Sequence, residues 1–262
     1  MSITQNIRFL IIPLCTVLGS AVYAQTNNTV TVIPAEPPQN QHIYLLIGQS
    51  NMAGRAPFTK AEEAVIERCH LLNGRDEWEP AKNPLNRYSS VRKELGMQKM
   101  GPGYYFAKTI LGKNRSLTIG LVVNAQGDSK IEEWRQGGRL YTEAIRRTKI
   151  AQKDGTLMGI LWHQGESNDG NPDGYIEKLK TLVTNLRTDL NAPNLPFVAG
   201  QINNAQAINK QIAMLPQSLP KTGFVSSKGL TTLDRRHFDA KSMRLLGRRY
   251  ADEMIRVQNK AP

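Results

Sequence analysis

The segment Ile43–Arg55, with the sequence IYLLIGQSNMAGR, decides how the rest of the chain is interpreted. Its first five residues are apolar or aromatic, and such a run is typical of a strand that is covered on both faces of a parallel sheet. The run leads directly into the small and polar residues Gly48–Asn51. In open α/β sheets, ligands bind outside the carboxyl ends of the strands. The segment therefore predicts a buried strand that delivers Ser50 to a cleft.

Three further apolar runs, at residues 116–124, 156–164 and 195–203, resemble this first one. Amphipathic helical patterns lie between and after them, at residues 172–190 and from Met243 to Met254. Alternation of strand and helix predicts a single α/β domain with a parallel sheet in a three-layer α/β/α architecture.

The N-terminal segment of the chain predicts an exported protein. Residues 1–24 contain Arg8, a short apolar run and a small-residue end, which predicts a cleavable signal peptide. The run is short for a bilayer span of about 20 residues, so we expect no stable membrane insertion. Residues 25–41 are predicted to form a flexible leader, and 42–262 the domain. The expected location is secreted or periplasmic.

The formal net charge of the chain is +12, but its basic residues are scattered and accompany no zinc-finger or RNP-type pattern. We therefore expect no nucleic-acid partner. Removal of the signal peptide would leave Cys69 as the remaining cysteine, which excludes an internal disulfide.

A serine becomes an effective nucleophile when a base, oriented by a third group, lies within hydrogen-bonding distance. His42 is predicted at the far end of its strand, His70 is expected to be structural, and His163 ends a strand. His237 lies in a loop, three residues after Asp234. That spacing allows the carboxylate to reach Nδ1 of His237 and leaves Nε2 for the serine.

Donors for an oxyanion and contacts for a sugar complete the candidate site. The N–H groups of Ser50 and Gly127 and the Gln164 amide are suitable donors. We expect substrate contacts from four residues, which flank the serine or carry an indole or guanidinium group: Gln49, Asn51, Arg55 and Trp134. Trp134 is equally compatible with a place in the core, and Arg55 with a place on the surface.

Four blocks, GQSNMAGR, AQGDSKIEEW, WHQGESN and DRRHF, resemble in order the conserved blocks of SGNH hydrolases. More narrowly, they are similar to the branch that contains sialate O-acetylesterase domains and acetyl xylan esterases of carbohydrate esterase family 6. The resemblance spans about residues 42–258. It implies a flavodoxin-like sheet, no metal, no cofactor and hydrolysis of acetyl esters on sugars.

Carried over to this chain, the resemblance makes Ser50 the nucleophile, His237 the base and Asp234 its partner. Glu166 matches a glutamate of this branch, so it stays an alternative partner of His237. The resemblance also implies an oxyanion hole made by Ser50, Gly127 and Gln164. Ser129, in the literal GDS triplet, is a less suitable nucleophile because choosing it would disturb the order of the blocks.

The sequence therefore predicts a serine esterase that removes O-acetyl groups from an acetylated poly- or oligosaccharide. One alternative is a non-catalytic carbohydrate-binding module on the same fold. Another is a basic protein that binds polyanions without turnover.

Overall fold

The computed structural model describes residues 40–260. The predicted signal peptide, 1–24, lies outside the described residues, and so does the predicted leader except for its last two residues. Gln41, the final residue of that leader, already belongs to the first strand.

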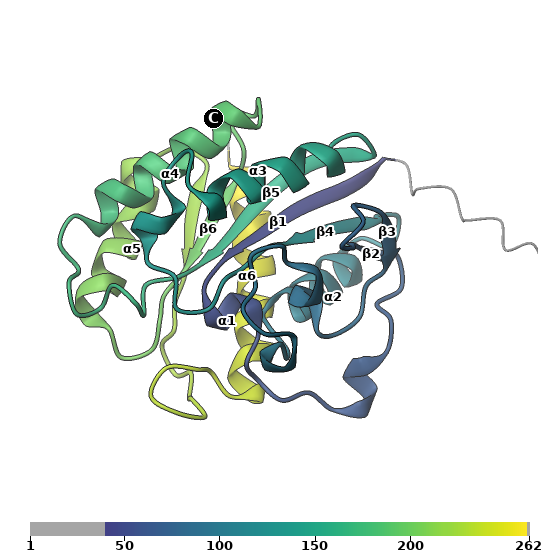
Figure 1. The fold of residues 1–262 in the computed structure, drawn as a ribbon, viewed down its shortest axis with the longest axis horizontal. Helices are drawn as coiled ribbons and strands as arrows, with labels where there is room; N and C mark the ends of the chain where they lie inside the picture. The colour runs from purple at the N-terminus through teal and green to yellow at the C-terminus, as the bar shows by residue number, and fades with distance from the viewer. Residues whose placement is uncertain (1–39, 261–262) are drawn as a thin grey trace, which may run out of the picture. The chain divides into compact units, whose positions relative to one another are not determined.

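The described residues contain a seven-stranded sheet in the order β3-β2-β4-β1-β5-β6-β7 (Figure 1). All neighbouring strands pair in parallel except β3, which runs antiparallel to β2 at one edge. Without the β2–β3 hairpin, the five remaining strands follow the order 2-1-3-4-5 of flavodoxin-like sheets, which confirms the predicted fold class. The strands are β1 Gln41–Gly48, β2 Cys69–Leu72, β3 Trp78–Pro80, β4 Ile119–Val123, β5 Gly155–His163, β6 Phe197–Gly200 and β7 Thr222–Val225.

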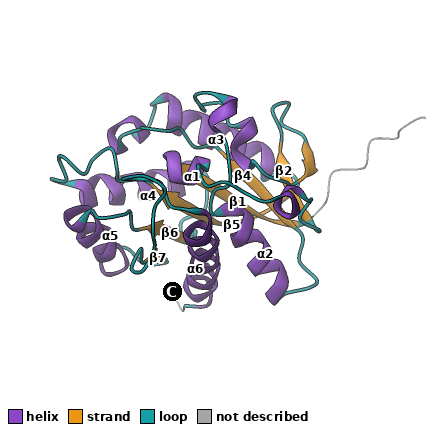
Figure 2. Ribbon diagram, turned by 90° about the horizontal axis from the view of Figure 1, so that it is seen from below, coloured by secondary structure: helices purple, strands orange, loops and turns teal. Residues whose placement is uncertain are grey.

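Helices cover both faces of this sheet (Figure 2). One face packs against α2 (Gly103–Lys113) and α6 (Ala240–Asn259). The other face packs against α3 (Arg139–Ala151), α4 (Tyr175–Asp189) and α5 (Gln206–Ser218). Shorter elements lie in the connections: α1 Ser50–Ala53, η1 Lys60–Glu63, η2 Leu85–Tyr88, η3 Leu95–Met97 and η4 Ile131–Trp134.

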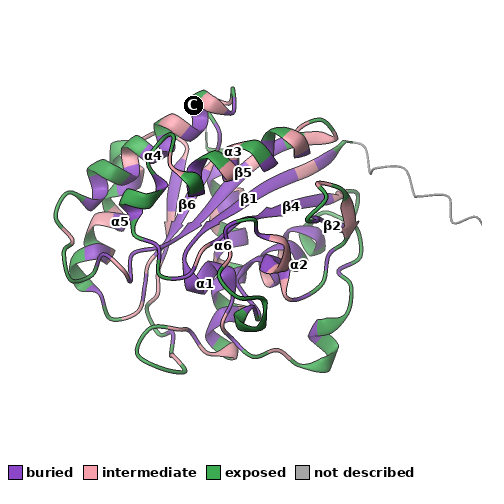
Figure 3. Ribbon diagram, viewed as in Figure 1, coloured by how far each residue is buried: buried purple, intermediate pink, exposed green. Residues whose placement is uncertain are grey.

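The two helical layers explain why β1 is apolar at successive positions. Tyr44 and Leu46 point into the cluster that contains α2 and α6. Ile43, Leu45 and Ile47 point into the cluster that contains α3, α4 and α5. Successive side chains of a strand alternate between the faces, so a strand in the middle layer must be apolar on both. Figure 3 shows β1 and its neighbours as buried through most of their lengths.

Some boundaries differ from the sequence-based expectation. Helix α4 begins at Tyr175, and Pro172 precedes it by three residues instead of lying in its first turn. The backbone carbonyl of Pro172 accepts a hydrogen bond from the N–H of Tyr175, and Gly174 has a φ of +67°. Gly174 thus has a left-handed backbone conformation, which separates Pro172 from the first turn of the helix. Among the described helices, none is long and apolar enough to cross a bilayer.

Candidate active site

Ser50 is brought to the carboxyl edge of the sheet by a tight turn after β1. Gly48 has a φ of +135°, and a Cβ atom at this position would lie 2.1 Å from the backbone oxygen of His163. The N–H of Gln49 donates a hydrogen bond to that same oxygen, at 2.8 Å. Only glycine fits this close approach of two strand ends. The chain then enters α1 with Ser50 as its first residue.

His237 connects Ser50 to Asp234. Nε2 of His237 lies 2.9 Å from Oγ of Ser50, and Nδ1 lies 2.7 Å from Oδ2 of Asp234. An ionised carboxylate only accepts hydrogen bonds, so we assign the imidazole proton to Nδ1. Nε2 then accepts from the Ser50 hydroxyl. The three side chains expected to act together are thus in hydrogen-bonding contact.

The carboxylate of Asp234 is stabilised in its charged form. Burial acts to raise its pKa, but hydrogen bonds from the backbone N–H groups of His237 and Arg236 and from the His237 side chain outweigh burial. The pKa of Asp234 is lowered to about 2. Asp234 therefore stays ionised throughout the pH range in which a histidine can act as a base.

Two backbone N–H groups, one of Ser50 itself and one of the neighbouring Gly127, have no acceptor among the described residues. A Cβ atom added to Gly127 would lie 3.8 Å from the Cβ of Ser50. Unpaired backbone N–H groups beside Ser50 are the kind of donor that stabilises an oxyanion on a serine.

Gln164 does not offer a free donor in this structure. Its side chain is fully buried, and Nε2 donates to Oε1 of Gln49, the backbone oxygen of Ser129 and Oδ1 of Asn168. These three acceptors already exceed the two protons of the amide. Gln164 therefore ties together the segments that follow β1, β4 and β5, and the expectation that it binds the oxyanion finds no support in this geometry.

Glu166 is close to the site but does not contact His237. Its Oε1 accepts a hydrogen bond of 2.6 Å from Nδ2 of Asn51, and Asp234 occupies the imidazole nitrogen that Glu166 would need. Burial raises the pKa of Glu166, although the Asn51 hydrogen bond opposes this effect. Of the two partners left open by the sequence, Asp234 is the one in contact with the base.

Three of the expected substrate contacts are buried. Gln49 and Asn51 are at most 1% exposed. Both polar atoms of the Asn51 side chain and Oε1 of Gln49 bond within the protein. Trp134 is also 1% exposed, and its ring packs edge-to-face on Trp162. Its Nε1 donates to Oγ of Ser129. The polar atoms of the Asn51 and Trp134 side chains are therefore occupied within the protein.

Ser129 is not placed as a nucleophile. Its Oγ donates to the backbone oxygen of Gln126, at 2.9 Å, and accepts from Trp134. No histidine or carboxylate side chain is bonded to Ser129 in residues 40–260. The GDS triplet therefore lacks the base that Ser50 has.

Arginine side chains border the site. The Arg55 side chain reaches Gly127, where a Cβ atom would lie 2.8 Å from its Nη2. Next to Gly127, Asp128 has a lowered pKa, first because Lys93 bonds to it and further because Arg236 and Arg55 are near. Around this one carboxylate there are thus three cationic side chains.

Sequence reasoning did not single out Arg236 or Asn168. Oδ1 of Asn168 accepts from the backbone N–H of Ile131 and from Gln164, so Asn168 fixes the start of η4 against the end of β5. Both residues lie inside the DRRHF and WHQGESN blocks. Their position inside these two blocks was therefore the feature of the sequence that could have identified them as site residues.

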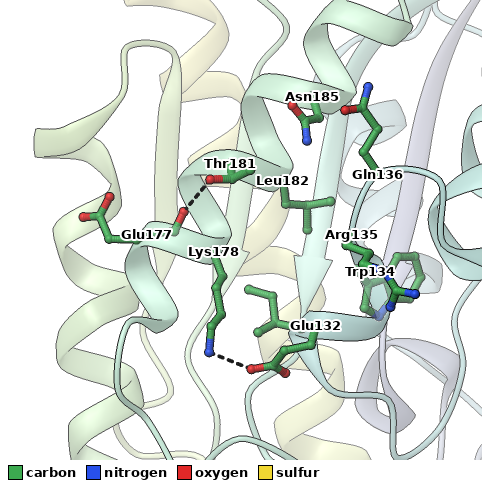
Figure 4. Close-up of a pocket in the computed structure, with 10 residues that line it drawn as sticks. Glu132, Trp134, Arg135, Gln136, Glu177, Lys178, Thr181, Leu182 and Asn185 are labelled. Carbon is green, nitrogen blue, oxygen red and sulfur yellow. Dashed lines mark hydrogen bonds and ion pairs between the residues drawn. The ribbon is translucent and has the colours of Figure 1, made fainter.

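A groove of about 540 Å³ lies elsewhere, between η4 and α4 (Figure 4). Trp134 and Leu182 contribute to its lining, and Lys178 forms an ion pair with Glu132 at its end. Neither Ser50, His237 nor Gly127 lines this groove. It is separate from the candidate active site.

The fold and the Ser50–His237–Asp234 arrangement define the class: an SGNH-like α/β hydrolase fold with the side chains of a serine hydrolase at the carboxyl edge of the sheet. Comparison with known proteins narrows this class. A family model described as "carbohydrate esterase, sialic acid-specific acetylesterase" matches residues 40–256. The chain belongs to this carbohydrate esterase family.

The chain is 34% identical over 217 residues to a probable carbohydrate esterase from Arabidopsis thaliana, covering 74% of this chain and 81% of that protein. The crystal structure of a protein from Arabidopsis thaliana superposes on this chain with a TM-score of 0.75 at 30% identity, covering 84% of this chain and 99% of that chain.

Two more distant structures share the fold. NanS gives a TM-score of 0.66 at 16% identity, covering 84% of this chain and 98% of that chain. A carbohydrate acetylesterase from Xanthomonas citri gives a TM-score of 0.60 at 19% identity, covering 80% of this chain and 55% of that chain.

Proposed function

We propose that this protein is a carbohydrate O-acetylesterase that works through Ser50, His237 and Asp234. The observation that carries the proposal is the continuous pair of hydrogen bonds from Ser50 Oγ to His237 Nε2 and from His237 Nδ1 to Asp234. Membership of the carbohydrate esterase family supports the choice of an ester on a sugar.

In the first half of the reaction, Ser50 Oγ attacks the acetyl carbonyl carbon while its proton passes to Nε2 of His237. Asp234 stabilises the imidazolium that forms. The carbonyl oxygen becomes an oxyanion, which the N–H groups of Ser50 and Gly127 stabilise. When the tetrahedral intermediate collapses, the C–O bond to the sugar breaks and His237 returns its proton to the sugar oxygen.

In the second half, water attacks the acetyl-serine. His237 takes a proton from this water, and the same two N–H groups stabilise the second oxyanion. Collapse breaks the bond between the acetyl carbon and Ser50 Oγ, and His237 protonates Oγ. Acetate leaves and the serine is regenerated.

The test is release of acetate from an aryl acetate and from acetylated glycans by the unaltered protein, Ser50→Ala and Ser129→Ala. We expect Ser50→Ala to lower kcat by about four to six orders of magnitude. Ser129→Ala is the matched control, because it removes a nearby serine hydroxyl that contacts no histidine, and it should retain activity. If the folded protein releases no acetate from any of these esters, the enzyme proposal fails in favour of a carbohydrate-binding module.

For the type of sugar, we propose an O-acetylated acidic glycan. The support is the group of cationic side chains around the site, in which Arg55, Arg236 and Lys93 surround the single carboxylate of Asp128. A guanidinium matches the planar geometry of a sugar carboxylate. The family description, which names sialic acid, points in the same direction.

Export is a separate proposal, supported by the pattern of residues 1–24 in the sequence. The check is the N-terminus of the protein recovered from its producing cells. Cleavage after Ala24 would support export, and an intact Met1 on all recovered protein would contradict it.

A further inference from the structure

Asn51, the residue that follows the candidate nucleophile, contacts the backbone on both sides of the candidate base. Its Nδ2 donates to the backbone oxygen of Arg236 at 3.0 Å, and its Oδ1 accepts from the N–H of Phe238 at 3.1 Å. These two groups belong to the residues immediately before and after His237. One buried amide therefore connects the backbone of the His237 loop to the helix that begins with Ser50.

The orientation of this amide is fixed by Glu166. The second proton on Nδ2 of Asn51 is directed to Oε1 of Glu166, at 2.6 Å. A 180° rotation of the amide would place its oxygen against Oε1 of Glu166 and against the Arg236 carbonyl, and would turn N–H groups toward the Phe238 N–H. Glu166 therefore selects the orientation in which Asn51 fits both sides of the loop.

The second oxygen of Glu166 and a ring nitrogen of the neighbouring His163 have no hydrogen-bond partner among the described residues. These atoms are Oε2 of Glu166 and Nε2 of His163, and His163 Nε2 lies 3.8 Å from Oε1 of Glu166. The hydroxyl of Tyr250 donates to the Trp162 carbonyl, so it can only accept from His163 Nδ1. Nε2 of His163 is then an acceptor without a donor.

A proton on Oε2 of Glu166 would neutralise the buried carboxyl group and leave Oε1 free to accept from Asn51. Burial favours this state, because it raises the pKa of Glu166 and lowers that of His163 to about 3. Both groups are then neutral, which avoids the cost of a buried charge.

We propose that Asn51 is a positioning residue for His237, and that Glu166 acts as a protonated, neutral support for the Asn51 amide rather than as a second carboxylate partner of the base. This inference rests on the proposed function, because it assigns His237 the role of base. It replaces our expectation that Asn51 binds substrate, since Asn51 is fully buried and its donors and acceptor are occupied.

The test compares kcat and KM on an aryl acetate for Asn51→Ala and Asn51→Asp. Loss of alignment between Ser50 and His237 should lower kcat about 100-fold, with KM within about threefold of the unaltered protein. Asn51→Asp keeps the shape but places oxygens against Glu166 and Arg236, so it remains informative if Asn51→Ala fails to fold. A kcat within about threefold in the folded variants would overturn the positioning role. A higher KM at unchanged kcat would also overturn it, in favour of substrate contact.

Glu166→Gln and Glu166→Ala test the second part. A glutamine retains an acceptor for Asn51 and is neutral like the protonated glutamate, so Glu166→Gln should stay within about tenfold of the unaltered kcat. Glu166→Ala removes the acceptor for Asn51, and its kcat should fall clearly further than that of Glu166→Gln. If the carboxylate charge itself assists His237, the glutamine variant will lose as much as the alanine variant, and the proposal for Glu166 is wrong.

Asn73→Ala is the matched control. The side chain of Asn73 is also buried and accepts from two backbone N–H groups, those of Arg75 and Glu77, in the β2–β3 turn. It touches neither Ser50 nor His237, so its loss should leave kcat unchanged. If Asn73→Ala lowers kcat as much as Asn51→Ala, the effect is a general loss of packing and the positioning role is rejected.

A second readout separates this inference from the proposed function. A fluorophosphonate reacts with an activated serine without requiring a sugar. If the unaltered protein releases no acetate but is phosphonylated, only the proposed function fails, and a 100-fold slower phosphonylation of Asn51→Ala then supports positioning. An unchanged phosphonylation rate rejects positioning. If the unaltered protein does neither, Ser50 is not activated and both proposals fail.

Discussion

Two pairs of a histidine and a carboxylate lie near Ser50 with the same spacing of three residues, and they differ in burial. In the loop before α6, the side chains of Asp234 and His237 are 55% and 24% exposed and lie 2.7 Å apart. At the end of β5, the side chains of His163 and Glu166 are 0% and 3% exposed, with a closest separation of 3.8 Å. Spacing alone therefore does not identify a catalytic pair.

The difference lies in what stabilises the charges. Two backbone N–H groups and the imidazole hold the pKa of Asp234 down at about 2. Glu166 accepts one side-chain hydrogen bond, and burial raises its pKa. The exposed pair is thus prepared to carry charge during a reaction, whereas the buried pair is stable when neutral. This comparison makes predictions about activity, stability and pH dependence.

The largest expected effect is the loss of activity in Asp234→Asn. A neutral amide no longer favours the Nδ1–H tautomer or stabilises the imidazolium, so kcat on an aryl acetate should fall by about three to four orders of magnitude. Glu166→Gln is the comparison variant, with an expected loss below about tenfold. A greater loss in Glu166→Gln than in Asp234→Asn would reverse the roles assigned to the two carboxylates.

The next effect concerns stability. His163→Ala removes a fully buried ring that packs edge-to-face on Phe238 and Tyr250, and should lower the free energy of unfolding by about 2–4 kcal/mol. His237→Ala alters an exposed loop and should cost less than about 1 kcal/mol. Urea unfolding of both variants provides the measurement. Equal costs would mean that burial does not separate the two pairs.

A smaller effect is expected at the charged border of the exposed pair. Arg55→Ala should raise KM about 3- to 10-fold for an acetyl ester of an acidic sugar, because one charge-assisted contact with the sugar carboxylate is lost. KM for a neutral aryl acetate should not change. Lys153→Ala, an exposed cation on the α3–β5 connection, is the control for net charge. Equal changes in KM for the acidic and the neutral ester would argue against recognition of the carboxylate by Arg55.

The smallest effect is a change in the pH dependence of stability. The pKa of Glu166 is raised in the folded protein, so above its unfolded pKa of about 4.3 the folded state binds more protons than the unfolded state. Its contribution to stability is therefore lost as the pH rises toward the folded pKa. Relative to the unaltered protein, Glu166→Gln should gain stability between pH 5 and pH 8 in urea unfolding. If Glu166→Gln instead loses stability relative to the unaltered protein as the pH rises, Glu166 is stabilised as an anion.

The sequence contained enough information for the central part of the fold and for the residues that meet at its edge. Buried parallel strands leave uninterrupted apolar runs, so β1, β4 and β5 were recognisable. The strands β3 and β7 have three and four residues and were not identified. Such short segments depend on pairing with a neighbouring strand more than on their own composition. The GQSN and DRRHF blocks located Ser50, Asp234 and His237 at one edge.

The sequence could not predict which partners the amide side chains of the site would bond to. Gln164 and Asn51 are residues that can donate to a ligand, but partners far away in the chain occupy their donors. Gln49 lies 115 positions from Gln164, and Arg236 lies 185 positions from Asn51. The rule that ligands bind at strand ends gives the location of a residue and not the atoms to which its side chain bonds.

Ser50 and His237 are separated by 187 residues in the chain. At a synthesis rate of about 5–20 residues per second, a ribosome that has incorporated Ser50 needs about 10–40 seconds to reach His237. During that time the serine has no base, and an unassisted hydroxyl is a weak nucleophile. The growing chain therefore has no assisted serine nucleophile at position 50 until His237 has been made and the chain has folded. Its chemistry begins only after nearly all of the polypeptide has been made.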